Sequence, residues 1–100
     1  VFRTTESPSS YEQKVANELC AILKSEGDLL LDIHSTSAPG PMSVFTDYPS
    51  EKNLALAEAL GAEYIILDWP LVYAQNQHGL TSSCTSDYAH EIGIPSATVE

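Results

Sequence analysis

Asp28-Leu-Leu-Leu-Asp-Ile-His34 is a continuous apolar run bounded by polar residues, and it decides the fold of the chain. Such a run is typical of a strand that is buried on both faces of a sheet. Side chains two positions apart in a strand point to the same face, so Asp32 and His34 are expected to project together. The run therefore predicts the central strand of a sheet, with a polar pair at its carboxyl end.

A helix is predicted before this strand, from about Ser10 to Ser25, and Gly27 ends it. Its start fits a capping box in which Ser9 is the N-cap and Glu12 reaches back to it. The apolar residues that come next at helical spacing are Val15, Ala16, Leu19, Ile22 and Leu23.

Two prolines and a glycine exclude regular structure from Ser35 to Pro41, so a loop is expected after the strand. The elements predicted next are a strand over Met42 to Thr46, a helix over Glu51 to Leu60 that Ser50 caps and Gly61 closes, and a strand over Glu63 to Leu67. A long loop from Asp68 to Ser83, a helix over Thr85 to Ile92 that Gly93 stops, and a strand over Ser96 to Glu100 complete the chain. This alternation predicts one α/β domain at most, with a mixed, largely parallel sheet and helices on both faces.

The composition narrows the class of partner. Four basic residues against 14 acidic ones give a formal net charge of −10, which disfavours nucleic acid and anionic membranes. The sequence shows neither an apolar run long enough to span a bilayer nor a signal peptide. Cys20 and Cys84 lack the spacing of a structural zinc site or a disulfide framework, so a reducing, cytoplasmic setting is expected. With no initiator Met and a last strand that stops in mid-course, residues 1–100 are interpreted as an internal fragment.

Two carboxylates and one histidine are the strongest candidates for chemistry. His34 suits a zinc ligand whose second ring nitrogen is supported by Asp32, but a hydrogen-bonded histidine without metal is an equal alternative. Glu100 closes a strand of small and apolar residues, and parallel sheets bind ligands at the carboxyl ends of their strands. His34 and Glu100 could therefore share one crevice, although spacing alone favours the alternative that Glu100 is a cut chain end emerging into solvent.

The remaining candidates have simpler explanations. His78 and His90 are interpreted as surface histidines, because neither has a metal-binding spacing to His34. Ser35 and Thr36 lie outside any Gly-x-Ser-x-Gly elbow, so loop hydrogen bonding accounts for them. Trp69 is interpreted as a core residue.

Three stretches resemble the succinylglutamate desuccinylase/aspartoacylase family of the zinc carboxypeptidase clan. Val1-Phe-Arg3 is similar to the residues directly after the family's Asn-Arg substrate-binding pair. Leu31-Asp-Ile-His-Ser-Thr36 resembles the Asp-Leu-His-(Ser/Asn)-Thr motif, whose His is the third zinc ligand. Gly93-Ile-Pro-Ser-Ala-Thr-Val-Glu100 is similar to the strand that leads into the catalytic Glu.

The resemblance implies a zinc-dependent hydrolase that cleaves the amide bond of a small-molecule N-acyl amino acid. His34 would be a zinc ligand, Asp32 its support and Glu100 the catalytic carboxylate, while the loop from Ser35 to Pro41, including Ser35 and Thr36, would shape the substrate pocket. The other two ligands would come from a His-x-x-Glu motif before residue 1, and a C-terminal domain would help close the site. An oligomer is compatible with the sequence. The competing interpretations are a small, acidic, metal-free α/β binding or regulatory domain, and a peptide carboxypeptidase of the same clan.

The missing ligands lead to a prediction about the isolated chain. A single histidine does not hold zinc with the affinity of a three-ligand site, so the isolated 100 residues should be catalytically inactive. The measurement is hydrolysis of N-acyl amino acids by the purified chain with added zinc. Turnover that a chelator abolishes would contradict it.

Overall fold

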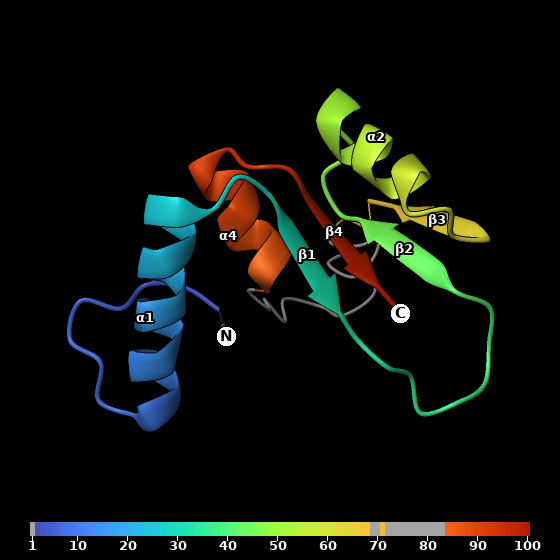
Figure 1. The fold of residues 1–100 in the computed structure, drawn as a ribbon. Coiled ribbons are helices and arrows are strands. Elements are labelled where there is room, and N and C mark those ends of the chain that lie inside the picture. Colours follow the sequence, from blue (N-terminus) through green and yellow to red (C-terminus); the bar gives the residue numbers. More distant parts are fainter. Residues whose placement is uncertain (1, 69–70, 72–83) are drawn as a thin grey trace.

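The computed structural model describes residues 2–68, 71 and 84–100. The helices in this part of the chain are α1 (Tyr11–Glu26), α2 (Glu51–Ala59) and α4 (Thr85–Ile92), and the strands are β1 (Leu30–Ile33), β2 (Ser43–Thr46), β3 (Tyr64–Leu67) and β4 (Ser96–Val99) (Figure 1). Each matches a predicted element to within about two residues at either end, and no regular structure interrupts the predicted loop from Ser35 to Pro41. The predicted loop from Asp68 to Ser83, which includes Trp69 and His78, lies almost entirely outside the described residues.

The strands form one mixed sheet in the order β1-β4-β2-β3. β1 is parallel to β4 and β2 is parallel to β3, whereas β2 and β4 are antiparallel. The predicted α/β class and mixed sheet are therefore confirmed.

The prediction of β1 as a central strand buried on both faces is wrong for the part of the chain that the structure describes. There β1 lies at an edge of the sheet, where Leu31 is 37% exposed and Ile33 is 73% exposed. An apolar run reports how hydrophobic a strand is, but strand order depends on pairings between distant segments. In this structure α2 packs mainly on β2 and β4, so Leu31 and Ile33 of β1 stay partly exposed.

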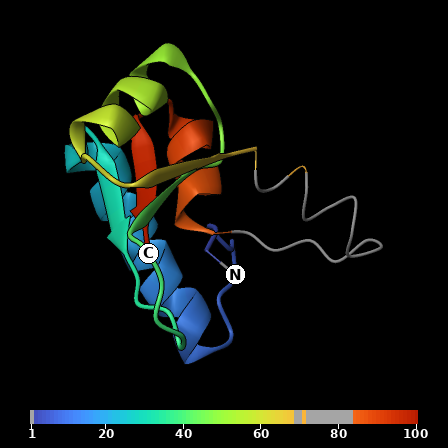
Figure 2. The same ribbon diagram turned by 90° about the vertical axis from the view of Figure 1, so that its right-hand side faces the viewer.

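The core forms where α2 packs on the sheet. Val44 of β2, Ala57 of α2 and Ala97 of β4 are buried together, with Leu56 and Val99 among the side chains around them. The next residue along β4, Thr98, points to the opposite face, and α4 packs there against β4 and β1. The predicted arrangement of helices on both faces is thus present, with β4 running between α2 and α4 (Figure 2).

The α1 helix begins one residue later than the predicted capping box. Ser10, not Ser9, is the N-cap: its hydroxyl accepts from the Gln13 N–H, and the Gln13 side chain accepts from the Ser10 N–H. The Ser9 N–H donates to the same Gln13 oxygen at 2.8 Å. Both Ser9-x-x-Glu12 and Ser10-x-x-Gln13 fit the capping-box pattern. The second forms because the Gln13 side chain accepts from the backbone N–H groups of both Ser9 and Ser10.

α1 packs beside α4 rather than directly on the sheet (Figure 1). Ala16 and Cys20 of α1 and Tyr88 and Ala89 of α4 are buried. The ring of Phe2 meets that of Tyr88 edge to face, with 6.1 Å between centroids. The segment before α1 is therefore tied to α4, which in turn contacts β1.

The helix ends supply a stability prediction. Gly93 ends α4 with a φ of +79°, whereas Gly40 has an ordinary φ, and a Cβ at either position meets open space. Gly93→Ala should therefore lower the free energy of unfolding by about 1 to 2 kcal/mol through backbone strain alone. Gly40→Ala should leave it within about 0.5 kcal/mol. Urea unfolding of both variants measures the difference, and equal effects would contradict the strain argument.

Candidate functional site

His34 and Glu100 come directly after the two parallel strands β1 and β4. The His34 N–H donates to the Val99 carbonyl at 2.8 Å, which extends the pairing of Ile33 with Val99 by one hydrogen bond. The carboxyl ends of parallel strands meet at one edge of a sheet, so both side chains leave the sheet at the same place. The structure thus brings His34 and Glu100 close together, as their places at the ends of parallel strands led us to expect, whereas the shared crevice stays a prediction.

The backbone of Glu100 is also held from its other side. Its N–H donates to the Ser43 carbonyl at 2.9 Å, and its carbonyl accepts from the Ser43 N–H at 2.8 Å. These two bonds attach Glu100 to the start of β2, beyond the end of β4. Its carboxylate therefore projects from a backbone that the sheet positions.

The three candidate side chains form a line. Asp32 Oδ1 lies 3.0 Å from His34 Nε2, as expected for residues two apart in a strand, and His34 Nδ1 lies 3.7 Å from Glu100 Oε1. The first distance is an ion-pair contact within hydrogen-bond range, whereas the second is too long for a hydrogen bond. The imidazole therefore has one nitrogen anchored and the other directed at a nearby carboxylate. The His34 side chain is 47% exposed, which leaves it accessible.

A hydroxyl that the sequence analysis did not single out completes this line. Thr85, the first residue of α4, donates to Asp32 Oδ2 at 2.5 Å across 53 positions of sequence. Each oxygen of the Asp32 carboxylate thus has its own partner. No local pattern signals this contact, because it depends on how α4 packs against β1.

The donor set around His34 fits zinc only in part. Imidazole nitrogen is an ordinary zinc ligand, and a ligating histidine usually donates its other N–H to a carboxylate or carbonyl. His34 has this arrangement: Asp32 engages Nε2, and Nδ1 remains available. Within residues 2–68, 71 and 84–100, however, no group of three or more His, Cys, Asp or Glu side chains is arranged to hold a metal. The described residues would therefore supply one zinc ligand, His34, and the carboxylate that supports it, Asp32.

Ser35 and Thr36, the predicted substrate-loop residues, are exposed directly after His34. The Thr36 hydroxyl donates to the Ala38 carbonyl at 2.5 Å, which is a local turn contact. His90 is exposed, as predicted, and its ring stacks on that of Tyr48 at 3.9 Å between centroids.

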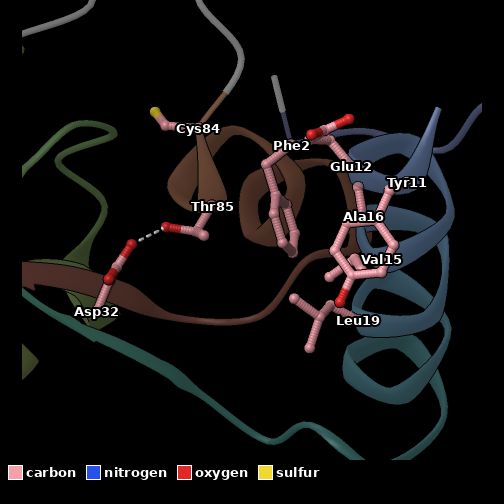
Figure 3. A pocket seen from close by; sticks show the side chains of 9 residues that line it. All are labelled: Phe2, Tyr11, Glu12, Val15, Ala16, Leu19, Asp32, Cys84 and Thr85. Carbon is pink, nitrogen blue, oxygen red and sulfur yellow. Dashed lines mark hydrogen bonds between the residues drawn. The ribbon is translucent and has the colours of Figure 1, made fainter.

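An open pocket of about 480 Å³ lies between α1 and the start of α4, with Asp32 in its lining (Figure 3). Its lining is mainly apolar and comes from Phe2, Tyr11, Val15, Ala16 and Leu19, with Glu12, Asp32, Cys84 and Thr85. In Figure 3 the hydrogen-bonded Asp32 and Thr85 lie toward one end and the side chains of α1 toward the other. Neither Ser35 nor Thr36 is among the described residues that line it.

A second polar cluster surrounds the start of α4. The Ser86 hydroxyl donates to Asp47 Oδ2 at 2.5 Å, and Tyr48 Oη donates to Asp87 Oδ1. Asp87 Oδ2 accepts from the Cys84 N–H at 2.7 Å and from the Cys84 thiol at 3.1 Å. Asp47 Oδ1 is buried and has no hydrogen-bond partner in the structure as described.

The two carboxylates of this cluster have opposite pKa shifts. Burial raises the pKa of Asp47, and the nearby charge of Asp87 adds to the rise. Burial also acts upward on Asp87, but hydrogen bonds from Tyr48 and Cys84 outweigh it and leave the pKa of Asp87 lowered. Burial and the bond to Asp87 raise the pKa of Tyr48, so its phenol remains protonated. The ionised form of Asp87 is thus favoured by its surroundings, whereas that of Asp47 is disfavoured by burial.

Comparisons of the chain with protein-family models, with curated proteins and with solved structures give no match. None of the helices in the described residues is long and apolar enough to cross a membrane. The family resemblance therefore stays a prediction, and the function has to be argued from the geometry around His34.

The opposite shifts give a pH prediction. The folded pKa of Asp47 is raised, so its ionisation costs stability as the pH rises from the unfolded value of about 3.9. The folded pKa of Asp87 is lowered, so it contributes stability above about 3.9 that is lost as the pH falls through the folded pKa. At pH 7, Asp47→Asn should unfold at higher urea concentration than wild type and Asp87→Asn at lower. Shifts of the same sign in both variants would refute this assignment.

Proposed function

We propose that this chain is part of a zinc-dependent amidohydrolase with a zinc carboxypeptidase-like fold, which cleaves the amide bond of an N-acyl amino acid. One observation carries the proposal: Asp32, His34 and Glu100 lie in line at the carboxyl ends of two parallel strands. The resemblance to the succinylglutamate desuccinylase/aspartoacylase family supports the same residues independently, through their sequence motifs.

His34 would be the ligand that this chain contributes. Asp32 Oδ1, 3.0 Å from Nε2, would accept a hydrogen bond from Nε2–H, and the lone pair of Nδ1 would then lie on the side of the ring that faces Glu100. Because a ligating imidazole must be neutral at the bonding nitrogen, this orientation is the one that binding requires. The remaining ligands would come from the His-x-x-Glu motif that the resemblance places before residue 1.

Zinc in a site of this kind supplies Lewis acidity, which makes water a stronger acid and the substrate carbonyl a better electrophile. Glu100 is then placed to act as the proton acceptor. Its Oε1 lies 3.7 Å from His34 Nδ1, close to where the ligand nitrogen is directed but without a hydrogen bond to it. The carboxylate would accept a proton from the attacking water and deliver one to the leaving amine, which yields a carboxylic acid and a free amino acid.

The test uses the full-length protein that contains this chain. His34→Ala should lose zinc, whereas Glu100→Gln should keep zinc and lose turnover of N-acyl amino acids by about 10²- to 10⁴-fold, because only proton transfer is removed. His90→Ala is a matched control, since that histidine is exposed and its described ring contact is with Tyr48. Zinc content and kcat are measured for each variant.

Retention of both zinc and turnover in His34→Ala and Glu100→Gln would overturn the proposal. The metal-free binding domain would then be the better interpretation, with Asp32 and His34 serving as a hydrogen-bonded pair at a strand end. Loss of zinc in His90→Ala as well would show that metal retention reports on folding rather than on ligation.

A further inference from the structure

We propose that Thr85 is a positioning residue that sets the ring orientation and tautomer of His34 by holding Asp32. Its consequence for zinc and turnover rests on the proposed function, whereas its effect on the imidazole does not. The observation is two contacts on one carboxylate: a hydrogen bond from Thr85 Oγ1 to Asp32 Oδ2 at 2.5 Å, and an ion-pair contact of 3.0 Å between His34 Nε2 and Asp32 Oδ1.

Asp32 needs such a partner because of where it lies. It belongs to an edge strand and its side chain is 26% exposed, so water competes with His34 for its oxygens. A carboxylate with one hydrogen-bond partner can rotate about χ2, because the energy profile of this torsion in Asp is broad and roughly two-fold. A second donor on the other oxygen fixes the plane of the carboxylate, and hence the direction from which Nε2–H must approach.

Thr85 is itself held firmly. It is the first residue of α4, and its neighbour Ser86 is buried with its hydroxyl on Asp47. Asp87 accepts from the backbone N–H of Cys84 at 2.7 Å, which closes the first turn of the helix on the other side of Thr85. Threonine is also stiff at χ1, so its hydroxyl has few alternative directions. The position of the donor is therefore set by α4 and not by the site it serves.

The chemical consequence is a choice of tautomer. A neutral imidazole carries its proton on either nitrogen, and the hydrogen bond made by one nitrogen decides what the other presents. With Asp32 held by Thr85, the proton lies on Nε2, and Nδ1 presents a lone pair toward Glu100. Without the Thr85 hydroxyl, Asp32 rotates toward water and this preference weakens.

The experiment records the ¹⁵N resonances of the His34 ring in the metal-free full-length protein, at a pH of about 9 where an ordinary imidazole is neutral. Wild type and Thr85→Ser, which keeps the hydroxyl, should show a protonated Nε2 and an unprotonated Nδ1. Thr85→Val, which keeps the shape without the hydroxyl, should move both resonances toward the average of the two tautomers.

Two results would overturn the inference. One is a Thr85→Val spectrum identical to that of wild type. The other is a wild-type ring protonated on Nδ1, which decides the matter even if Thr85→Val fails to fold. In the zinc-loaded protein, Thr85→Val should weaken zinc affinity by about 10- to 100-fold and Thr85→Ser should restore it to within a few-fold of wild type. If the protein neither binds zinc nor hydrolyses N-acyl amino acids, the proposed function fails while the ¹⁵N spectra still decide the role of Thr85.

Discussion

The parallel pairing of β1 with β4 is the constraint on which the candidate site depends. Its register aligns Ile33 with Val99, the last residues of the two strands. His34 directly follows β1 and Glu100 directly follows β4, so these two residues lie side by side. A shift of one residue in either strand would turn one of these side chains to the opposite face of the sheet. The short sheet is thus sufficient to place an imidazole beside a carboxylate, provided that β4 is held in register from its other side by β2.

The start of α4 supports this arrangement from above the sheet. Each of its first three residues makes a hydrogen bond that includes a different carboxylate. Thr85 donates to Asp32, Ser86 donates to Asp47, and Asp87 accepts from Tyr48. Successive residues of a helix project about 100° apart, so a single turn can reach both β1 and the segment after β2. The same turn therefore links the line through His34 with the buried polar cluster around Asp47.

Local patterns in the sequence predicted those features that local geometry determines. The period of a strand was enough to place Asp32 beside His34, and the ends of parallel strands were enough to place His34 near Glu100. Strand order was not predictable, because the apolar run from Leu29 to Ile33 is compatible with a central strand and with an edge strand that is only partly covered. Thr85 was missed for a related reason, since its contact joins segments 53 residues apart and leaves no pattern in either of them.

The energetics of the site favour an orienting role for the contacts around His34 over a stabilising one. The His34 and Asp32 side chains are partly exposed, and ion pairs in such positions contribute about 0 to 1 kcal/mol to folding. The Thr85 hydroxyl adds one hydrogen bond to a carboxylate, which contributes about 1.5 to 3 kcal/mol at most and less where water competes, as it does at this partly exposed side chain. Larger contributions come from the buried cluster of Val44, Ala57 and Ala97, which lies on the opposite face. Because the core does not depend on Asp32, the carboxylate and its two partners are free to set the direction of one imidazole nitrogen toward Glu100.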